Sequence, residues 1–154
     1  MSKKTSKVGA SKETVKVDEI KETDEIKELE ACTGSMKLFT IKGKYKGKIV
    51  KVHDGDTVHC VIKYNNCLQK FVIRLDNIDT AELNSKDIDK KAKALEARDE
   101  LAKMILNKIV DIQCNGFDKY GRLLGIIYYN DECINEKIIK LHLGVEYHGG
   151  TKEK

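Results

Sequence analysis

Two clusters of polar residues stand at the ends of residues 57–75, a stretch whose apolar side chains alternate as they do in strands. The first cluster comprises Asp54, Gly55, Asp56 and Thr57, and the second comprises Arg74, Asp76, Asp79, Thr80 and Glu82. Carboxylates that gather in one place repel one another unless a cation neutralises them. Their oxygens suit hard cations such as Ca²⁺ and Mg²⁺. If the fold brings both clusters together, these residue types predict a cation site.

A β-hairpin would bring the two clusters together. Residues 57–64 and 67–75 predict two strands, and Asn65-Asn66 predicts a two-residue turn because asparagine tolerates positive φ. This turn pairs Thr57 with Arg74 and places the core residues on the opposite face. Arg74 then points away from the core and lies beside the turn at residues 54–57. A three-residue loop would reverse this register.

The remaining pattern predicts a mainly β fold with helices (α+β). Residues 48–53 predict a strand before the hairpin, and residues 87–107 predict a helix after it. Two further strands are predicted at 108–114 and 122–129, with a loop at 115–121 between them. A last helix is predicted at 134–141 and ends before Gly144. Three strands, a helix, two strands and a helix match a five-stranded OB-fold Greek-key barrel with two or three helices.

The composition predicts one domain with a tail. Residues 1–38 contain no aromatic residue and as many acidic residues as lysines, so the net charge of +4 lies in the remainder. We expect a disordered tail over 1–38, with transient helix at 18–29, an OB-fold domain over 39–148 and a short tail over 149–154. The basic start precedes no apolar run, and the cysteines lack CxxC spacing. We therefore expect no secretory signal, no membrane segment and an intracellular, cytoplasmic protein.

Arginine is rare in this lysine-rich chain, and two arginines border polar turns. Arg74 lies near the end of the second hairpin strand, and Arg122 ends the segment DKYGR at residues 118–122. Guanidinium groups bind phosphate oxygens in a bidentate manner. Salt bridges to Asp76 or Asp118 are the alternative explanation for these arginines.

Zinc is a weaker alternative to an oxygen-ligated cation. Cys60 and Cys67 lie near His53 and His59 in the sequence, but their spacing fits no standard zinc site. The hairpin register also turns Cys60 toward the core.

Four segments resemble the staphylococcal nuclease (thermonuclease-like) family. They are VHDGDTV at 52–58, FVIRLDNIDTAE at 71–82, DKYGRLLGIIY at 118–128 and INEKIIKLHLG at 134–144. They occur in the family's order, and the resemblance covers roughly residues 45–148. It implies an OB-fold barrel that hydrolyses DNA and RNA with Ca²⁺ and leaves 3′-phosphate ends.

The resemblance also implies roles for individual residues. Asp56 and Asp79 match carboxylate ligands of the metal, Thr80 a ligand through its backbone carbonyl, and Asp54 a supporting carboxylate. Glu82 matches the glutamate that activates or orients the attacking water. Arg74 and Arg122 match the arginines that hold the phosphate, and Lys119 and Tyr120 match substrate-binding positions. Ala81 departs from the family's proline, and the loop at 83–91 is shorter.

Three functional hypotheses follow. The first is a monomeric calcium-dependent nuclease that prefers single-stranded DNA or RNA. The second is a binding module of the same fold that recruits nucleic acid or protein without cleavage; such modules lack several catalytic residues, whereas this chain has all of them. In the third, the domain is a scaffold and residues 1–38 carry the interaction.

Overall fold

The computed structural model describes residues 21–149 of the 154-residue chain. The chain divides into two compact units, Met1–Phe39 and Thr40–Lys154. In the first unit residues 21–30 are helical and exposed, and they overlap residues 18–29, where the sequence predicts transient helix. Most of the predicted N-terminal tail, residues 1–20, and residues 150–154 of the C-terminal tail lie outside the described residues.

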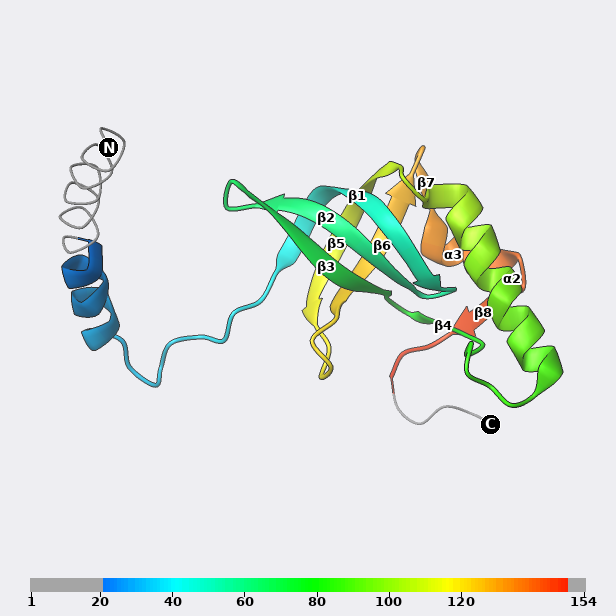
Figure 1. The fold of residues 1–154 in the computed structure, drawn as a ribbon, viewed down its shortest axis with the longest axis horizontal. Helices are drawn as coiled ribbons and strands as arrows, with labels where there is room; N and C mark the ends of the chain where they lie inside the picture. Colours follow the sequence, from blue (N-terminus) through cyan, green and yellow to red (C-terminus); the bar gives the residue numbers. More distant parts are fainter. Residues whose placement is uncertain (1–20, 150–154) are drawn as a thin grey trace, which may run out of the picture. The chain divides into compact units, whose positions relative to one another are not determined.

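The second unit is built around a closed barrel of five strands (Figure 1). These strands are β1 (Lys42–Asp54), β2 (Thr57–Tyr64), β3 (Cys67–Leu75), β5 (Ile109–Phe117) and β6 (Leu123–Tyr129). Their order is β3-β2-β1-β5-β6, and a parallel pairing between β3 and β6 closes the barrel. The five-stranded OB-fold predicted from the sequence is therefore confirmed.

The β2–β3 hairpin has the predicted register. Asn65 and Asn66 form the turn with φ values of 47° and 63°, and Thr57 pairs with Arg74. Arg74 lies on the face opposite Ile73, as predicted, but its side chain is buried. Arg74 is only 9% exposed because it lies inside a cleft among carboxylates.

Two strands extend beyond their predicted limits. β1 begins six residues before the predicted strand, at Lys42, and β5 continues through Phe117 into the predicted loop. The missing signal in β1 has a steric cause. Gly47 faces the core there, and a Cβ at this position would collide with Sγ of Cys60. The inward position must therefore be glycine and carries no apolar side chain.

Three short strands were not predicted: β4 (Ile78–Thr80), β7 (Glu132–Cys133) and β8 (Gly144–Glu146). β4 and β8 pair with each other outside the barrel. The helices α2 (Ile88–Ile105) and α3 (Ile134–Lys140) agree with the predicted segments to within one residue at their starts and two residues at their ends. No helix in the described part of the chain is long and apolar enough to cross a bilayer.

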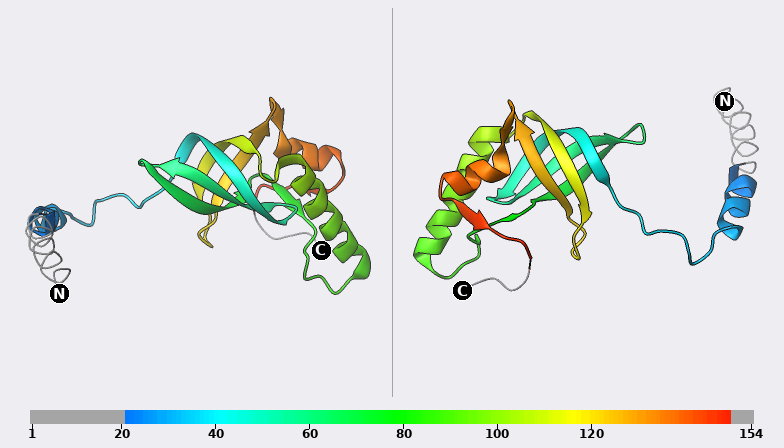
Figure 2. Two further views of the ribbon diagram at one scale, coloured as in Figure 1. Left: turned by 45° about the horizontal axis from the view of Figure 1, so that its top comes forward. Right: turned by 180° about the vertical axis from the view of Figure 1, so that it is seen from behind.

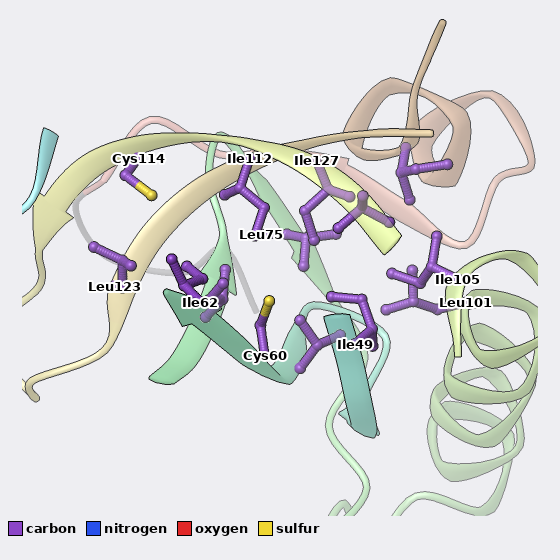
Figure 3. Close-up of a cluster of buried hydrophobic side chains, with 14 of the residues drawn as sticks. Ile49, Cys60, Ile62, Leu75, Leu101, Ile105, Ile112, Cys114, Leu123 and Ile127 are labelled. Carbon is purple, nitrogen blue, oxygen red and sulfur yellow. The ribbon is translucent and has the colours of Figure 1, made fainter. Parts of the chain in front are cut away.

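The core fills the barrel and continues to one side of α2 (Figure 3). Leu101 and Ile105 of α2 are fully buried. Asp87 is the N-cap of this helix, and its side chain accepts hydrogen bonds from the backbone N–H groups of Asp89 and Lys90. Burial raises the pKa of Cys60 to about 12 and that of Cys114 to about 11, so both thiols stay protonated at neutral pH. Cys60 is a core residue, as the register predicted.

Asn135, in the first turn of α3, ties the helix to the barrel. Its Nδ2 donates to the carbonyl oxygens of Asp76 (2.9 Å) and Gly125 (3.1 Å), and its Oδ1 accepts from the N–H of Ile127 (3.0 Å). The residue is only 3% exposed. It fixes the turn at Asp76, through which the chain passes from β3 to β4.

Replacing Asn135 with alanine would leave buried backbone groups without this partner. We expect Asn135→Ala to lower the free energy of unfolding by about 2–3 kcal/mol in urea denaturation. Asn84→Ala, at an exposed position, is the matched control and should change it little. Equal stability of the two variants would contradict a structural role for Asn135.

Candidate active site

Every site residue predicted from the sequence lines one cleft of about 660 Å³. It lies where β1, β2 and β3 meet β4 and the loop between β5 and β6. Its lining includes Asp54, Asp56, Arg74, Asp79, Thr80, Glu82, Lys119, Tyr120 and Arg122. The two polar clusters at the ends of the hairpin therefore share one cavity with the DKYGR loop.

Asp56 is the buried centre of the cleft. Its Oδ1 accepts a hydrogen bond from Oγ1 of Thr57 (3.0 Å), and its Oδ2 accepts one from the N–H of Thr80 (3.1 Å). The preceding residue must be small: a Cβ on Gly55 would lie 2.6 Å from Cβ of Ala97. The Asp-Gly-Asp sequence thus lets the turn pack closely against α2 while Asp56 holds β4.

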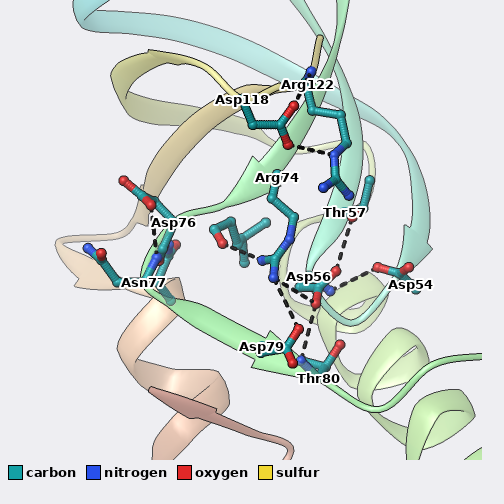
Figure 4. Close-up of polar contacts among 12 residues, drawn as sticks. Asp54, Asp56, Thr57, Arg74, Asp76, Asn77, Asp79, Thr80, Asp118 and Arg122 are labelled. Carbon is teal, nitrogen blue, oxygen red and sulfur yellow. Dashed lines mark hydrogen bonds and ion pairs between the residues drawn. The ribbon is translucent and has the colours of Figure 1, made fainter. Parts of the chain in front are cut away.

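Arg74 joins the two carboxylates that the sequence proposes as metal ligands (Figure 4). Its Nη2 lies 3.1 Å from Oδ1 of Asp79 and 3.5 Å from Oδ2 of Asp56. Its Nη1 donates to the carbonyl oxygen of Leu75 at 2.7 Å. Burial opposes ionisation of Asp56, but the Arg74 charge and hydrogen bonds from its neighbours outweigh burial and lower the pKa of that carboxyl.

Asp54 stands at the edge of this network. Its Oδ1 accepts the N–H of Asp56 at 3.1 Å. Burial and the adjacent Asp56 carboxylate raise the pKa of Asp54 to about 6. Two neighbouring carboxyls therefore have pKa values displaced in opposite directions, which marks this end of the hairpin as a place where negative charge is concentrated.

The donor chemistry here fits a hard cation. Asp56 and Asp79 present carboxylate oxygens to the same nitrogen of Arg74. Oγ1 of Thr80 is buried without a hydrogen-bond partner among the described residues. No three His, Cys, Asp or Glu side chains in residues 21–149 form a cluster that could hold a metal, so carboxylates alone do not complete a coordination sphere. Ca²⁺ and Mg²⁺ also accept carbonyl and water oxygens, so these residues fit such an ion rather than zinc.

Arg122 is held at the cleft by Asp118, four residues earlier. Nε of Arg122 lies 2.8 Å from Oδ2 of Asp118, whose Oδ1 accepts the N–H groups of Tyr120 and Arg122 at 2.9 Å each. Burial opposes ionisation of Asp118, but these hydrogen bonds and the guanidinium outweigh it and lower the pKa. The salt bridge weighed in the sequence analysis is therefore present, and it orients Arg122 while leaving it in the cleft.

Tyr120 is an exposed aromatic residue beside these charges. The side chain is 72% exposed, and its ring centroid lies 5.2 Å from Nζ of Lys119 and 5.5 Å from Cζ of Arg122. Both contacts are within cation–π range. An exposed ring flanked by cations can stack on a base while the cations face phosphate oxygens.

Sequence reasoning treated a salt bridge to Asp118 only as an alternative to phosphate binding by Arg122, and so missed that Asp118 orients Arg122. It also missed the wall formed after β8. The N–H of Tyr147 donates to the carbonyl oxygen of Asn77 at 2.9 Å, and both Tyr147 and His148 line the cleft. The local pair of an aspartate and an arginine within DKYGR was a usable signal for the first role. The wall depends on the β4–β8 pairing, for which the sequence carries no periodic signal.

The raised pKa of Asp54 predicts how the stability of the metal-free protein changes with pH. Folding favours the protonated carboxyl, so its contribution to stability is lost as pH rises through about 6. Because the side chain is partly exposed, we expect Asp54→Asn to raise the free energy of unfolding by only about 1 kcal/mol near pH 7.5, with no gain below about pH 4.

Urea denaturation in EDTA at both pH values measures this difference. Asp99→Asn, on the exposed side of α2, is the control and should show no such pH-dependent gain. A gain at the acidic pH, or the same gain in Asp99→Asn, would contradict the raised pKa.

The chain is similar in sequence to several known proteins. The chain matches the family model described as staphylococcal nuclease homologue over residues 72–153. It is 29% identical to an uncharacterized endonuclease of Haemophilus influenzae over 120 residues, which cover 75% of this chain and 62% of that protein. It is 37% identical over 79 residues to staphylococcal-like nuclease CAN1 of Arabidopsis thaliana (51% of this chain, 23% of that protein).

A further relative is the micrococcal nuclease of Shigella flexneri, 30% identical over 84 residues that cover 54% of this chain and 42% of that protein. The chain thus spans less than two thirds of the length of these relatives. The family model matches more than half of the chain, in the part that contributes Arg74, Asp79, Glu82 and Arg122 to the cleft. The chain therefore belongs to the staphylococcal nuclease family.

Proposed function

We propose that the protein is a calcium-dependent nuclease that hydrolyses phosphodiester bonds of DNA, RNA or both and leaves 3′-phosphate ends. One observation carries this proposal: Asp56, Asp79, Arg74, Glu82 and Arg122 line the same cleft. A family member that only binds nucleic acid or protein has no need of two carboxylates, a further glutamate and two arginines in one place.

Asp56 and Asp79 would hold the calcium ion together with the carbonyl oxygen of Thr80, with Asp54 supporting them. Bound calcium polarises a phosphate oxygen and offsets the charge that develops at phosphorus. The hydrogen bond from the N–H of Thr80 to Asp56 keeps the hairpin and β4 at a fixed separation. This bond supports the proposal, because it would hold the proposed ligands from the two ends of the hairpin in place before an ion binds.

Arg74 and Arg122 would hold the phosphate from two sides. The first is buried at the end of β3, and the second is held by Asp118 at the start of β6. Each guanidinium offers planar donors that match phosphate oxygens. Loss of one such group typically slows the reaction about 10²–10³-fold, because the stabilised charge exists only in the transition state.

Glu82 would accept a proton from the attacking water, aligned opposite the departing 5′ oxygen. It follows β4 and lines the cleft, and the N–H of Ser85 donates to its carbonyl oxygen at 3.2 Å. Ala81 precedes it where the family has proline. Alanine leaves φ less restricted than proline does, so the Glu82 loop has more conformational freedom before substrate binds.

The exposed Tyr120 ring supports a preference for single-stranded nucleic acid, because an unpaired base can lie flat on it. The five cysteines are free, which supports an intracellular location. We also propose that the protein is a monomer.

Deletion of residues 1–38 addresses the alternative in which the tail carries the interaction. Loss of the main binding partner would favour that alternative.

The nuclease proposal predicts cleavage of single-stranded DNA or RNA with millimolar Ca²⁺ and no cleavage in EDTA. Glu82→Gln should abolish cleavage with Ca²⁺, because the amide cannot accept the proton from water. Glu96→Gln, an exposed position on α2, is the matched control and should cleave as the unmodified protein does. Comparable cleavage in EDTA or by Glu82→Gln would refute the assignment.

A further inference from the structure

Lysines dominate the outer face of β1, β2 and β3. Four of them alternate along the first half of β1 with residues that face the core, and one each comes from later in β1, from β2 and from β3. They are Lys42, Lys44, Lys46, Lys48, Lys51, Lys63 and Lys70, and all are exposed. We call this surface the lysine face. The only acidic residue within these three strands is Asp54, at the cleft end.

The strand register makes the lysine face continuous with the cleft. Lys48 and Lys70 both pair with Val61, so the three side chains lie on one face. Two residues nearer the cleft, His59 lies on the same face. Another two residues on, Thr57 pairs with Arg74, which is already inside the cleft. Rows of side chains therefore follow one another about 7 Å apart from the hairpin turn to the cleft.

The positive charge of this face is largely unbalanced. Lys46 forms an ion pair with Asp111 at 2.8 Å. Among the described residues, no acidic side chain pairs with Lys48, Lys51, Lys63 or Lys70.

His59, in the middle of the lysine face, has a pKa that reflects these charges. Burial, together with the charges of Lys51, Lys70 and His53, lowers the pKa of His59. The imidazole is therefore kept neutral, and the surface attracts anions through its lysines.

We propose that the lysine face binds the phosphate backbone of a single-stranded nucleic acid whose scissile phosphate lies in the cleft. The placement of the scissile phosphate in the cleft rests on the proposed function, and Arg74 connects the cleft with the lysine face. Asn66 of the hairpin turn is eight residues from Arg74, so the two lie about 26 Å apart along the strand, a distance that about eight stacked nucleotides would span. Lysine ammonium groups contact phosphates without reading bases, so this second contact is independent of sequence.

A polyanionic strand fits the face better than an acidic protein does. A regular row of point charges along three adjacent strands suits the repeating charge of a phosphodiester chain. The apolar side chains between the lysines are aliphatic: Val61, Val72 and, opposite Lys63, Leu68. Outside the cleft, the strands carry no tryptophan and no arginine on this face, two of the residue types that most often anchor protein interfaces.

Binding measured in EDTA tests the proposal without relying on cleavage. The probe is a fluorescent single-stranded DNA of about 20 nucleotides, titrated at about 50–200 mM salt. For Lys48→Gln/Lys63→Gln/Lys70→Gln we expect about 10–100-fold weaker binding at 0.1 M salt. The slope of log K against log salt should become shallower by about 2, because about 0.7 of an ion is released per single-strand phosphate contact.

The matched control is Lys93→Gln/Lys103→Gln/Lys140→Gln, which removes the same charge from α2 and α3. The tip of the β2–β3 hairpin points away from these helices (Figure 2). Control binding should change much less, and a trinucleotide, which cannot reach the far rows, should bind both variants alike. Circular dichroism verifies that each variant is folded.

Equal losses in both variants, or an unchanged salt slope in the lysine-face variant, would overturn the proposal. So would unchanged binding of DNA together with lost binding to vesicles containing phosphatidylserine, because the face would then serve an anionic membrane. If the protein binds DNA through these lysines but does not cleave it with Ca²⁺, the nuclease proposal fails and the binding surface stands.

Discussion

The buried pair of Asp56 and Arg74 is the interaction on which the rest of the site depends. Both residues are less than one-tenth exposed, and neither could be buried alone without a large desolvation penalty. The hairpin register places Arg74 opposite Thr57, the residue after Asp56. The Asp56 carboxylate also accepts the N–H of Thr80, and the Asp56 backbone carbonyl oxygen accepts the N–H of Leu75 at 2.7 Å. One carboxylate thus couples the start of β2, the end of β3 and β4.

Barrel closure brings the second arginine to the first. β3 and β6 pair in parallel, so Arg74 lies beside Leu124, two residues after Arg122. The N–H of Asp76 donates to the carbonyl oxygen of Gly125 at 2.9 Å, and Asn135 braces the same turn from α3. Contacts between distant parts of the chain therefore determine the spacing of the two guanidinium groups. The lysine face ends one row of side chains from Arg74, because Lys51 pairs with His59 and Arg74 pairs with Thr57, and this closeness would let a single strand use both surfaces.

The parts of the fold that were predictable have strong local signals. The Asn65-Asn66 turn and the alternation on both sides of it were sufficient for the β2–β3 register. β4 and β8 have three residues each, too few for a periodic pattern, and their pairing joins segments more than 60 residues apart. The first half of β1 was not predicted, because its inward position at Gly47 has no apolar side chain. The sequence grouped the site residues because the hairpin brings its own ends together, but the burial of Arg74 depends on β4, which was not predicted.

The chemistry at the ends of a cleaved strand tests the central claim most directly. Mass spectrometry of a defined single-stranded oligonucleotide, incubated with the protein and Ca²⁺, identifies both new termini. A site in which water attacks opposite a departing 5′ oxygen predicts a 3′-phosphate on one fragment and a 5′-hydroxyl on the other. Fragments ending in a 3′-hydroxyl, or an oligonucleotide left intact by folded protein, would contradict the account.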